Sequence, residues 1–246
     1  MEQIATKTEI FNQLQQEILR LQGLSKPTTG SSVCTGLGPV EAACPGGVFP
    51  MAAVHEFLSY QKEHAAATNG FISGILGRLM LSGGSCLWIG NKRTIFPAAM
   101  KIFGLEPDRI IFLDLEREKD VLWATEEALR CEGLAAVVSE LSELSFTESR
   151  RLQLAVEQSH VTGFIHRYYP RKENTVACVS RWRILPLASE MDSNLPGIGF
   201  PRWNVELRKI KNGRPGTWQF EWSDTGFRHL STAIPVAISQ KVSQTG

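Results

Sequence analysis

Several groups that could do chemistry follow a predicted buried strand at 54–58 and precede a predicted helix at 68–81. They are two hydroxyls, an amine and a carboxylate in the predicted loop 58–68: Ser59, Thr68, Lys62 and Glu63. In many α/β proteins, a loop in this position binds nucleotide phosphates through glycine N–H groups and a Lys-Ser/Thr pair that opens the helix. This stretch has no glycine and no such pair, and Glu63 would repel phosphate. The sequence therefore predicts a nucleotide-binding scaffold without the chemistry of phosphate binding.

A second set of candidate groups is basic. Between Arg150 and Arg214 there are twelve Lys or Arg and five Asp or Glu residues, although the chain carries a net charge of only +1. Cations alternate with aromatic residues in places, as in proteins that bind single-stranded nucleic acid, but a solvated face is the alternative. On a strand, Arg181 and Arg183 would share one face while Trp182 points to the other. The candidate contacts to DNA or a partner are Arg167, Arg171, Lys172, Arg181, Arg183, Arg202 and Trp203.

Other chemical motifs are incomplete. His55-Glu56 could begin a zinc-protease motif, but Ser59 stands where the second histidine is required. The five cysteines form no Cys-x-x-Cys pair, which indicates reduced thiols rather than a metal site. No Gly-x-Ser-x-Gly nucleophile motif occurs, and we expect His160 and His166 to be structural or surface residues. These patterns predict no catalytic residue and no bound metal.

Composition limits the class of protein. The 246 residues are 43% hydrophobic and 21% charged, which is typical of a soluble globular protein. The N-terminus lacks the basic and apolar regions of a secretory signal, and no apolar run approaches the roughly 20 residues of a membrane-spanning helix. We therefore expect a cytoplasmic protein that does not bind a membrane.

The N-terminal region is predicted to be separate from the core. Residues 8–22 carry four apolar residues at helical spacing: Ile10, Leu14, Ile18 and Leu21. A linker rich in Gly, Ser and Thr follows at 23–32. The predicted organisation is a helical arm and linker at 1–33, one domain at 34–230, and a flexible tail at 231–246.

Strands and helices alternate in the first part of this domain. Apolar strands are predicted at 85–89, 109–113, 134–138 and 163–168, and helices at 96–103, 118–130 and 145–159. The last helix begins with a capping box formed by Ser145 and Glu148. Buried strands joined by helices predict a mostly parallel sheet that is flanked by helices on both faces.

The pattern changes after residue 170. Strands are predicted at 175–182, 203–210 and 217–222 without helices between them, and a Pro/Gly-rich loop lies at 186–201. The turn signals at 212–216 (NGRPG) predict that the last two strands form a hairpin. The fold class is therefore α/β, with a sheet that closes with antiparallel C-terminal strands.

Several sequence motifs carry a more specific resemblance. They are GGVFP at 46–50, VHEF at 54–57, LWI at 87–89, GLEPDRI at 104–110, WATEEALR at 123–130, SRRLQLA at 149–155 and FPRWNVEL at 200–207. Their order resembles a RecA-like core and, more specifically, the ImuA family of RecA-like accessory proteins from bacterial damage-induced mutagenesis cassettes. The resemblance covers about residues 37–230.

The resemblance implies that this chain lacks three parts of an active RecA-like ATPase. Its phosphate loop has no Gly-Lys-Thr, and Gly90-Asn91-Lys92 follow the strand after which active relatives place a catalytic glutamate. Glu140 stands near the place of a Mg²⁺-linked aspartate. Without these groups, the electrostatic stabilisation of phosphoryl transfer is largely lost. We therefore expect no enzymatic activity and no cofactor, and we do not expect ATP to bind.

The resemblance also implies partners. These would be the inactive Y-family-like polymerase homologue of the same cassette (the ImuB type), the error-prone C-family DNA polymerase, and RecA. The expected function is a noncatalytic role in SOS-induced translesion synthesis. Two alternatives are an ATPase with a divergent phosphate loop and a module that binds single-stranded DNA.

Overall fold

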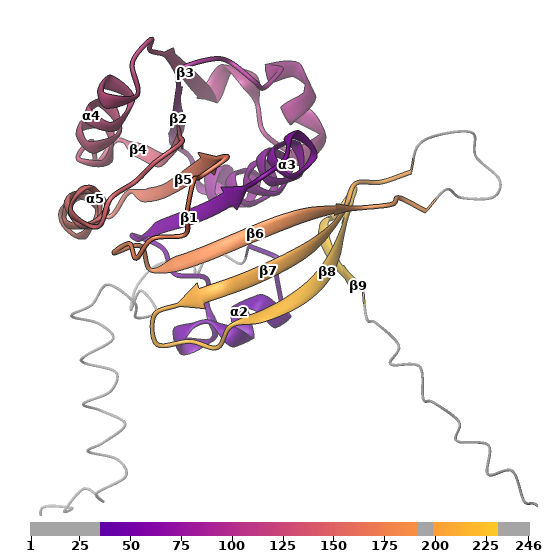
Figure 1. Ribbon diagram of the computed structural model, residues 1–246. Helices are drawn as coiled ribbons and strands as arrows, with labels where there is room; N and C mark the ends of the chain where they lie inside the picture. The colour runs from indigo at the N-terminus through magenta and orange to yellow at the C-terminus, as the bar shows by residue number, and fades with distance from the viewer. Residues whose placement is uncertain (1–34, 191–198, 231–246) are drawn as a thin grey trace, which may run out of the picture.

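The computed structural model describes residues 35–190 and 199–230, so the predicted N-terminal arm and C-terminal tail lie outside the described residues. In the described part, nine strands form one sheet in the order β3-β2-β4-β5-β1-β6-β7-β8-β9 (Figure 1). The strands are β1 Val54–Ser59, β2 Ser85–Gly90, β3 Ile110–Asp114, β4 Leu134–Leu141, β5 Thr162–Tyr168, β6 Ser180–Leu187, β7 Arg202–Ile210, β8 Gly216–Ser223 and β9 Gly226–Leu230.

Along the sheet, neighbouring strands are parallel from β3 through β2, β4, β5 and β1 to β6, as expected for a mostly parallel sheet. Helix α3 (Lys62–Leu79) and the 3₁₀ helix η3 (Pro97–Phe103) cover one face of the parallel sheet, whereas α4 (Glu118–Leu129) and α5 (Phe146–Ser159) cover the other. Each face has its own hydrophobic cluster, around Phe57 and Phe71 on the α3 side and around Val54 and Leu152 on the α5 side. The α/β class with helices on both faces is therefore confirmed.

Local signals placed helix α5 correctly. The Ser145 hydroxyl accepts a hydrogen bond from the Glu148 N–H at 3.3 Å, and the Glu148 carboxylate accepts one from the Ser145 N–H at 2.8 Å. These two bonds satisfy N–H groups that a helix N-terminus otherwise leaves unpaired. The helix ends at Ser159, and the next residue, His160, adopts the left-handed conformation with φ 64°.

The sheet closes with antiparallel strands, also as predicted. β6, β7, β8 and β9 pair in sequence, and the turn between β7 and β8 contains Asn212 at φ 58°. Strand β9 was missed, because its Gly226 and its charged Arg228 obscure the apolar pattern. Its Phe227 packs edge-on against Trp222 with ring centroids 4.9 Å apart, and this contact fixes the strand on the sheet.

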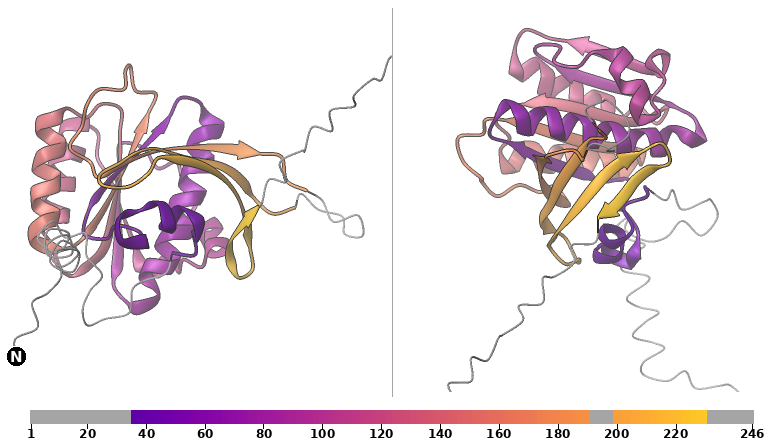
Figure 2. Two further views of the ribbon diagram at one scale, coloured as in Figure 1. Left: turned by 90° about the horizontal axis from the view of Figure 1, so that it is seen from below. Right: turned by 90° about the vertical axis from the view of Figure 1, so that its right-hand side faces the viewer.

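A short helix before β1 attaches the N-terminal end of the described chain to this hairpin. Helix α2 (Pro39–Ala43) places Val40 in the core with no exposed surface, beside Leu37. The Ala43 carbonyl accepts a hydrogen bond of 2.9 Å from the Arg214 N–H in the β7–β8 turn. In Figure 2, α2 lies against the concave side of the antiparallel strands. The N-terminal end of the described chain is therefore held against the β7–β8 hairpin.

Several predicted elements have different bounds in the structure. The strand predicted at 134–138 continues to Leu141, and the strand predicted at 175–182 begins only at Ser180. The helix predicted at 96–103 is a 3₁₀ helix, and it is followed by Gly104, where φ is 73°. No helix in the described part of the chain is long and apolar enough to cross a bilayer.

The glycines of α3 allow close packing. A Cβ on Gly77 would overlap the carbonyl oxygen of Phe103 in η3, and a Cβ on Gly74 would lie 2.7 Å from the Trp222 and Phe227 rings. At Gly70, the Phe103 ring would be 3.1 Å from an added Cβ. The close neighbours are η3 and the aromatic residues of β8 and β9.

We predict that Gly77→Ala destabilises the protein by about 1–3 kcal/mol, because overlap with a backbone atom outweighs the roughly 1 kcal/mol that alanine gains in helix propensity. Urea unfolding measures the difference. Gly70→Ala is the matched control and should cost less, because its nearest neighbour is a side chain that can shift. A stabilised Gly77→Ala variant would contradict this packing.

Candidate functional site

The carboxyl end of β1, where the sequence predicted a loop, is the first part of the candidate site. Only Tyr60 and Gln61 connect β1 to α3, which begins at Lys62 rather than at the predicted Thr68. The prediction of a loop over 58–68 was wrong, because Ala65 to Ala67 favour a helix and no glycine interrupts it. A connection of two residues is too short to form a loop around a phosphate.

The two hydroxyls of this region point into the protein. Ser59 ends β1 and Thr68 lies in the second turn of α3, and neither has exposed surface. Their oxygens are 3.0 Å apart, and Ser59 Oγ is 2.8 Å from His166 Nε2 on β5. The hydroxyls are therefore used inside the protein. By contrast, Lys62 and Glu63 are exposed on the first turn of α3.

His166 extends this network along the carboxyl ends of the parallel strands. Its Nδ1 is 2.8 Å from Asn69 Oδ1, an acceptor, so Nδ1 carries the proton and Nε2 accepts from Ser59. Burial lowers the pKa of His166 to about 3, which is consistent with a neutral ring. The Asn69 amide in turn donates a hydrogen bond of 3.1 Å to the Tyr168 hydroxyl.

The network ends at Glu140, which lies inside β4. Its Oε1 accepts hydrogen bonds from Trp88 Nε1 at 2.9 Å, from the Tyr168 hydroxyl at 3.1 Å and from the Thr94 hydroxyl at 3.2 Å. The residue is 7% exposed, and burial raises its pKa above the usual value for a carboxyl group. Glu140 was predicted to follow the strand, but β4 continues past it and holds it in place.

Sequence reasoning missed most of this network. It identified Ser59, Thr68 and Glu140 but did not connect them to Asn69, His166 or Tyr168. The available signal was the position of two polar residues, Ser59 and His166, near the ends of their strands. Their pairing depends on β1 and β5 being neighbours, which the sequence alone did not show.

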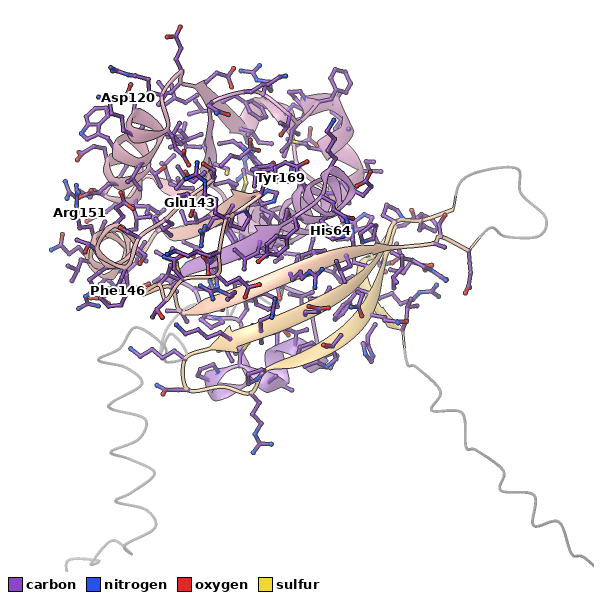
Figure 3. All side chains as sticks on the ribbon, in the orientation of Figure 1. His64, Asp120, Glu143, Phe146, Arg151 and Tyr169 are labelled. Carbon is purple, nitrogen blue, oxygen red and sulfur yellow. The ribbon has the colours of Figure 1, made fainter. Side chains whose placement is uncertain are left out.

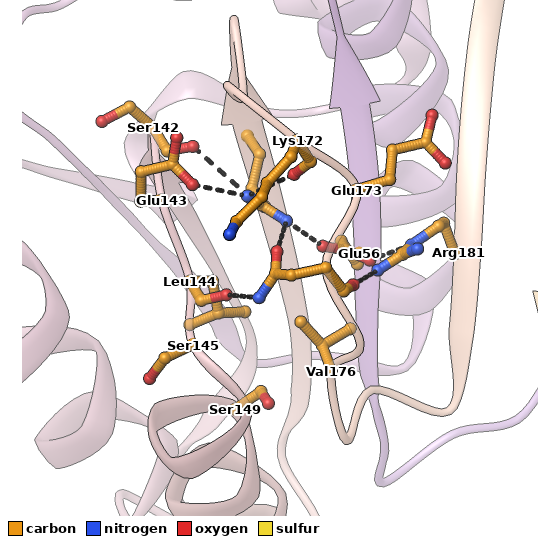
Figure 4. A network of polar contacts seen from close by, with 12 residues as sticks. Glu56, Ser142, Glu143, Leu144, Ser145, Ser149, Lys172, Glu173, Val176 and Arg181 are labelled. Carbon is orange, nitrogen blue, oxygen red and sulfur yellow. Dashed lines mark hydrogen bonds and ion pairs between the residues drawn. The ribbon is translucent and has the colours of Figure 1, made fainter.

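A second, ionic network lies on the opposite face of β1 (Figure 4). Arg167 and Glu56 are both fully buried, and Arg167 Nη1 is 2.7 Å from Glu56 Oε1. Arg181 binds the other oxygen of Glu56 at 2.5 Å, and Arg167 also contacts Glu143 at 3.0 Å and Asn174 at 3.1 Å. Arg167 was a candidate surface contact, but its charge is used to neutralise a buried carboxylate.

The remaining basic candidates divide into engaged and exposed groups. Arg202 is 2.7 Å from Glu221 and 2.6 Å from Glu190, while Arg183 lies over the Tyr60 ring at 5.7 Å. Trp203 is only 3% exposed and packs in the core, so it does not present a surface for stacking.

Arg171 and Lys172 are exposed in the loop between β5 and β6. The neighbouring Tyr169 is 50% exposed, and Figure 3 labels it near the carboxyl ends of the parallel strands, as it does Glu143. The Arg171 N–H donates a hydrogen bond of 2.9 Å to the Glu143 carboxylate. The structure therefore does not gather the predicted cations into one basic surface.

An apolar groove lies beside the carboxyl ends of the parallel strands. Its volume is about 610 Å³, and it is formed by α3, η3 and the base of the β6–β7 connection. Phe96 and Phe200 on its rim are 72% and 46% exposed, and the Trp203 ring contributes to its floor. Sequence analysis singled out the Trp203 region but not Phe96 or Phe200.

The described cysteine, histidine and acidic residues form no metal site. Their four cysteines are free thiols, and burial raises the pKa of Cys44 and Cys86 to about 12. No group of three or more His, Cys, Asp or Glu residues in the described ranges is placed to bind a metal.

The fold and this edge together define an α/β sheet protein whose first strand–helix junction is filled by its own hydrogen-bonded side chains. No protein-family model matches the chain. It is similar to the ImuA proteins of two Caulobacter vibrioides strains, NA1000 / CB15N and ATCC 19089 / CIP 103742 / CB 15. Each is 32% identical over 199 residues, which cover 76% of this chain and 82% of the relative. The chain therefore belongs to the ImuA family.

We predict that Arg167→Met destabilises the protein by about 3–5 kcal/mol, because it leaves the buried Glu56 with one cation fewer. Urea unfolding at neutral pH measures the change. Arg150→Met is the control, since its pair with Glu157 at 3.8 Å is exposed, and it should cost less than about 1 kcal/mol. Equal effects of the two substitutions would contradict the structural role of Arg167.

We also predict that stability falls in mild acid. Burial lowers the pKa of His55 to about 4 and that of His166 to about 3, whereas in the unfolded chain both take up protons below about pH 6.5. The stability is therefore fully present above about pH 6.5 and declines below it, by up to about 1.4 kcal/mol per pH unit for each histidine.

Urea unfolding at several pH values between about 5 and 7.5 tests this expectation. The raised pKa of Glu140 acts in the opposite sense, so the comparison of wild type with His166→Gln isolates the histidine. The variant should lose stability less steeply with falling pH. An unchanged slope would show that His166 is not kept neutral by the fold.

Proposed function

We propose that this protein is a noncatalytic accessory of SOS-induced, error-prone DNA repair and translesion synthesis. Membership of the ImuA family supports this role. The mixed sheet, with β1 at its centre and antiparallel strands at one side, is compatible with our interpretation of a RecA-like core.

The observation that carries the noncatalytic part is the junction between β1 and α3. Ser59 and Thr68, which would be the hydroxyls closest to a bound nucleotide, bond to each other, and Ser59 also bonds to His166. Lys62 is exposed on a helix that starts directly after two connecting residues, Tyr60 and Gln61. Binding a triphosphate here would require unwinding the first turns of α3 and breaking a buried network, and both cost free energy.

Under this proposal the protein acts through its surfaces. Its partners would be the inactive Y-family-like polymerase homologue of the same cassette, the error-prone C-family polymerase, and RecA. The apolar groove is the surface we assign to the polymerase homologue, because Phe96 and Phe200 expose large aromatic side chains on its rim. Buried aromatic anchors supply much of the energy of protein interfaces.

We predict that the full-length chain captures the purified polymerase homologue, and that the double variant Phe96→Asp and Phe200→Asp weakens this binding by about tenfold or more. Surface-immobilised binding measurements give the affinities. Trp123→Asp is the control, because Trp123 is 64% exposed on α4, away from the groove. In cells that lack the native gene, the double variant should also restore less damage-induced mutagenesis than the control.

Two outcomes would contradict the proposed function. The first is thermal stabilisation or turnover with Mg·ATP, since a ligand at 100 times its dissociation constant adds about 2.7 kcal/mol of stability. Loss of that effect in Lys62→Ala would identify an ATPase. The second is salt-dependent binding to single-stranded DNA without any binding to the polymerase homologue, weakened by Arg183→Ala.

A further inference from the structure

A small cavity lies where β2, β4 and β5 end. Its volume is about 220 Å³, and the residues around it include Lys92, Thr94, Glu118, Val121, Glu140 and Tyr168. It is separate from the apolar groove, because the two share no lining residue. The proposed function makes no use of this cavity.

The two oxygens of Glu140 have different surroundings. Oε1 accepts all three hydrogen bonds that fix the carboxylate, from Trp88, Thr94 and Tyr168. Among the described residues, no hydrogen bond or ion pair reaches Oε2. Since Glu140 is 7% exposed and lines the cavity, its carboxylate is held in place there with one oxygen still available as an acceptor.

The charges around the cavity favour a cation. Its lining has two carboxylates, Glu118 and Glu140, and one amine, Lys92, which is exposed. Glu118 is already bound by the Ser142 hydroxyl at 2.7 Å and by the Glu143 N–H at 3.0 Å. Glu140 therefore remains as the carboxylate available to a ligand. A phosphate would be repelled by this pair, whereas a cation would gain a hydrogen-bonded ion pair.

An organic cation fits this cavity better than a metal ion does. Metal sites for Mg²⁺ or Ca²⁺ need several oxygen ligands, and the described residues hold no cluster of three or more metal-binding side chains. Val121 and Leu141 add apolar surface to the cavity, and Tyr168 adds an aromatic ring. This combination suits a charged nitrogen group on an aliphatic stem, since the stem packs on methyl groups and the cation on the ring.

We propose that this cavity binds a guanidinium or primary ammonium group, with Glu140 Oε2 as its counter-ion. The group belongs either to an Arg or Lys side chain of a partner protein or to a free polyamine. The inference stands apart from the proposed function, because it concerns a different surface and is tested without the polymerase homologue.

The test uses the full-length chain and the ¹⁵N–¹H signal of the Trp88 indole, which is bonded to Glu140 and is assigned with Trp88→Phe. The probes are N-acetyl-arginine methylamide, N-acetyl-lysine methylamide, spermidine and, as a neutral isostere of the first, N-acetyl-citrulline methylamide. We expect the cationic probes to shift the signal in a saturable manner and the citrulline probe to leave it unchanged. Tighter binding of the capped amino acids points to a protein side chain, and tighter binding of spermidine points to a free polyamine.

Three variants complete the design. Glu140→Gln removes the charge but keeps the shape, and it should weaken binding of the arginine probe by about tenfold or more. Lys92→Ala changes only an exposed cation at the cavity and should strengthen binding several-fold, so it tests the electrostatics without disturbing the core. Glu127→Gln, an exposed carboxylate paired with Arg130 on α4, should bind like wild type.

The proposal is overturned by any of three results. One is an equal response to the arginine and citrulline probes. Another is unchanged binding by both Glu140→Gln and Lys92→Ala. The last is a shift produced by MgCl₂ but not by any organic cation, which would make the cavity a metal site.

Discussion

Glu56 lies on β1, the central strand of the sheet, between its parallel neighbours β5 and β6, and its two oxygens bind Arg167 on β5 and Arg181 on β6. Removing three charges from water is costly, and the cost is offset only when each group is fully paired. The surrounding acceptors meet that condition, because Glu143 and Asn174 bond to the rest of the Arg167 guanidinium. These charged contacts therefore fix the register of the three central strands, β5, β1 and β6.

The same strand organises the other face with neutral groups. Ser59, at its end, bonds to Thr68 and His166, and from there hydrogen bonds continue through Asn69 and Tyr168 to Glu140. The carboxyl ends of parallel strands are the usual place for ligands in α/β proteins. Here that place is largely occupied by the protein's own polar side chains, and this occupation is the physical basis of our proposal of a binding rather than a catalytic role.

Features that depend on neighbours in sequence were predictable. Ser145 and Glu148 identified the start of α5, and Asn212-Gly213 identified the β7–β8 hairpin. Features that depend on distant partners were not. Nothing local to Arg167 reveals that Glu56 faces it across β1 and β5, and the burial of Trp203 follows from α3 and β9 packing above it. The start of α3 was also missed, because the expectation of a phosphate loop outweighed the helix propensity of Ala65 to Ala67.

The attachment of α2 to the β7–β8 turn has a practical consequence for anyone who designs fragments of this protein. Leu37 and Val40 have no exposed surface, and the Ala43 carbonyl accepts a hydrogen bond from the Arg214 N–H. A truncated version that starts at β1 would open the core beside the hairpin and leave this turn without its partner. Tags, cleavage sites and split reporters therefore belong before Thr35, outside the stretch that attaches the beginning of the core to the β7–β8 hairpin.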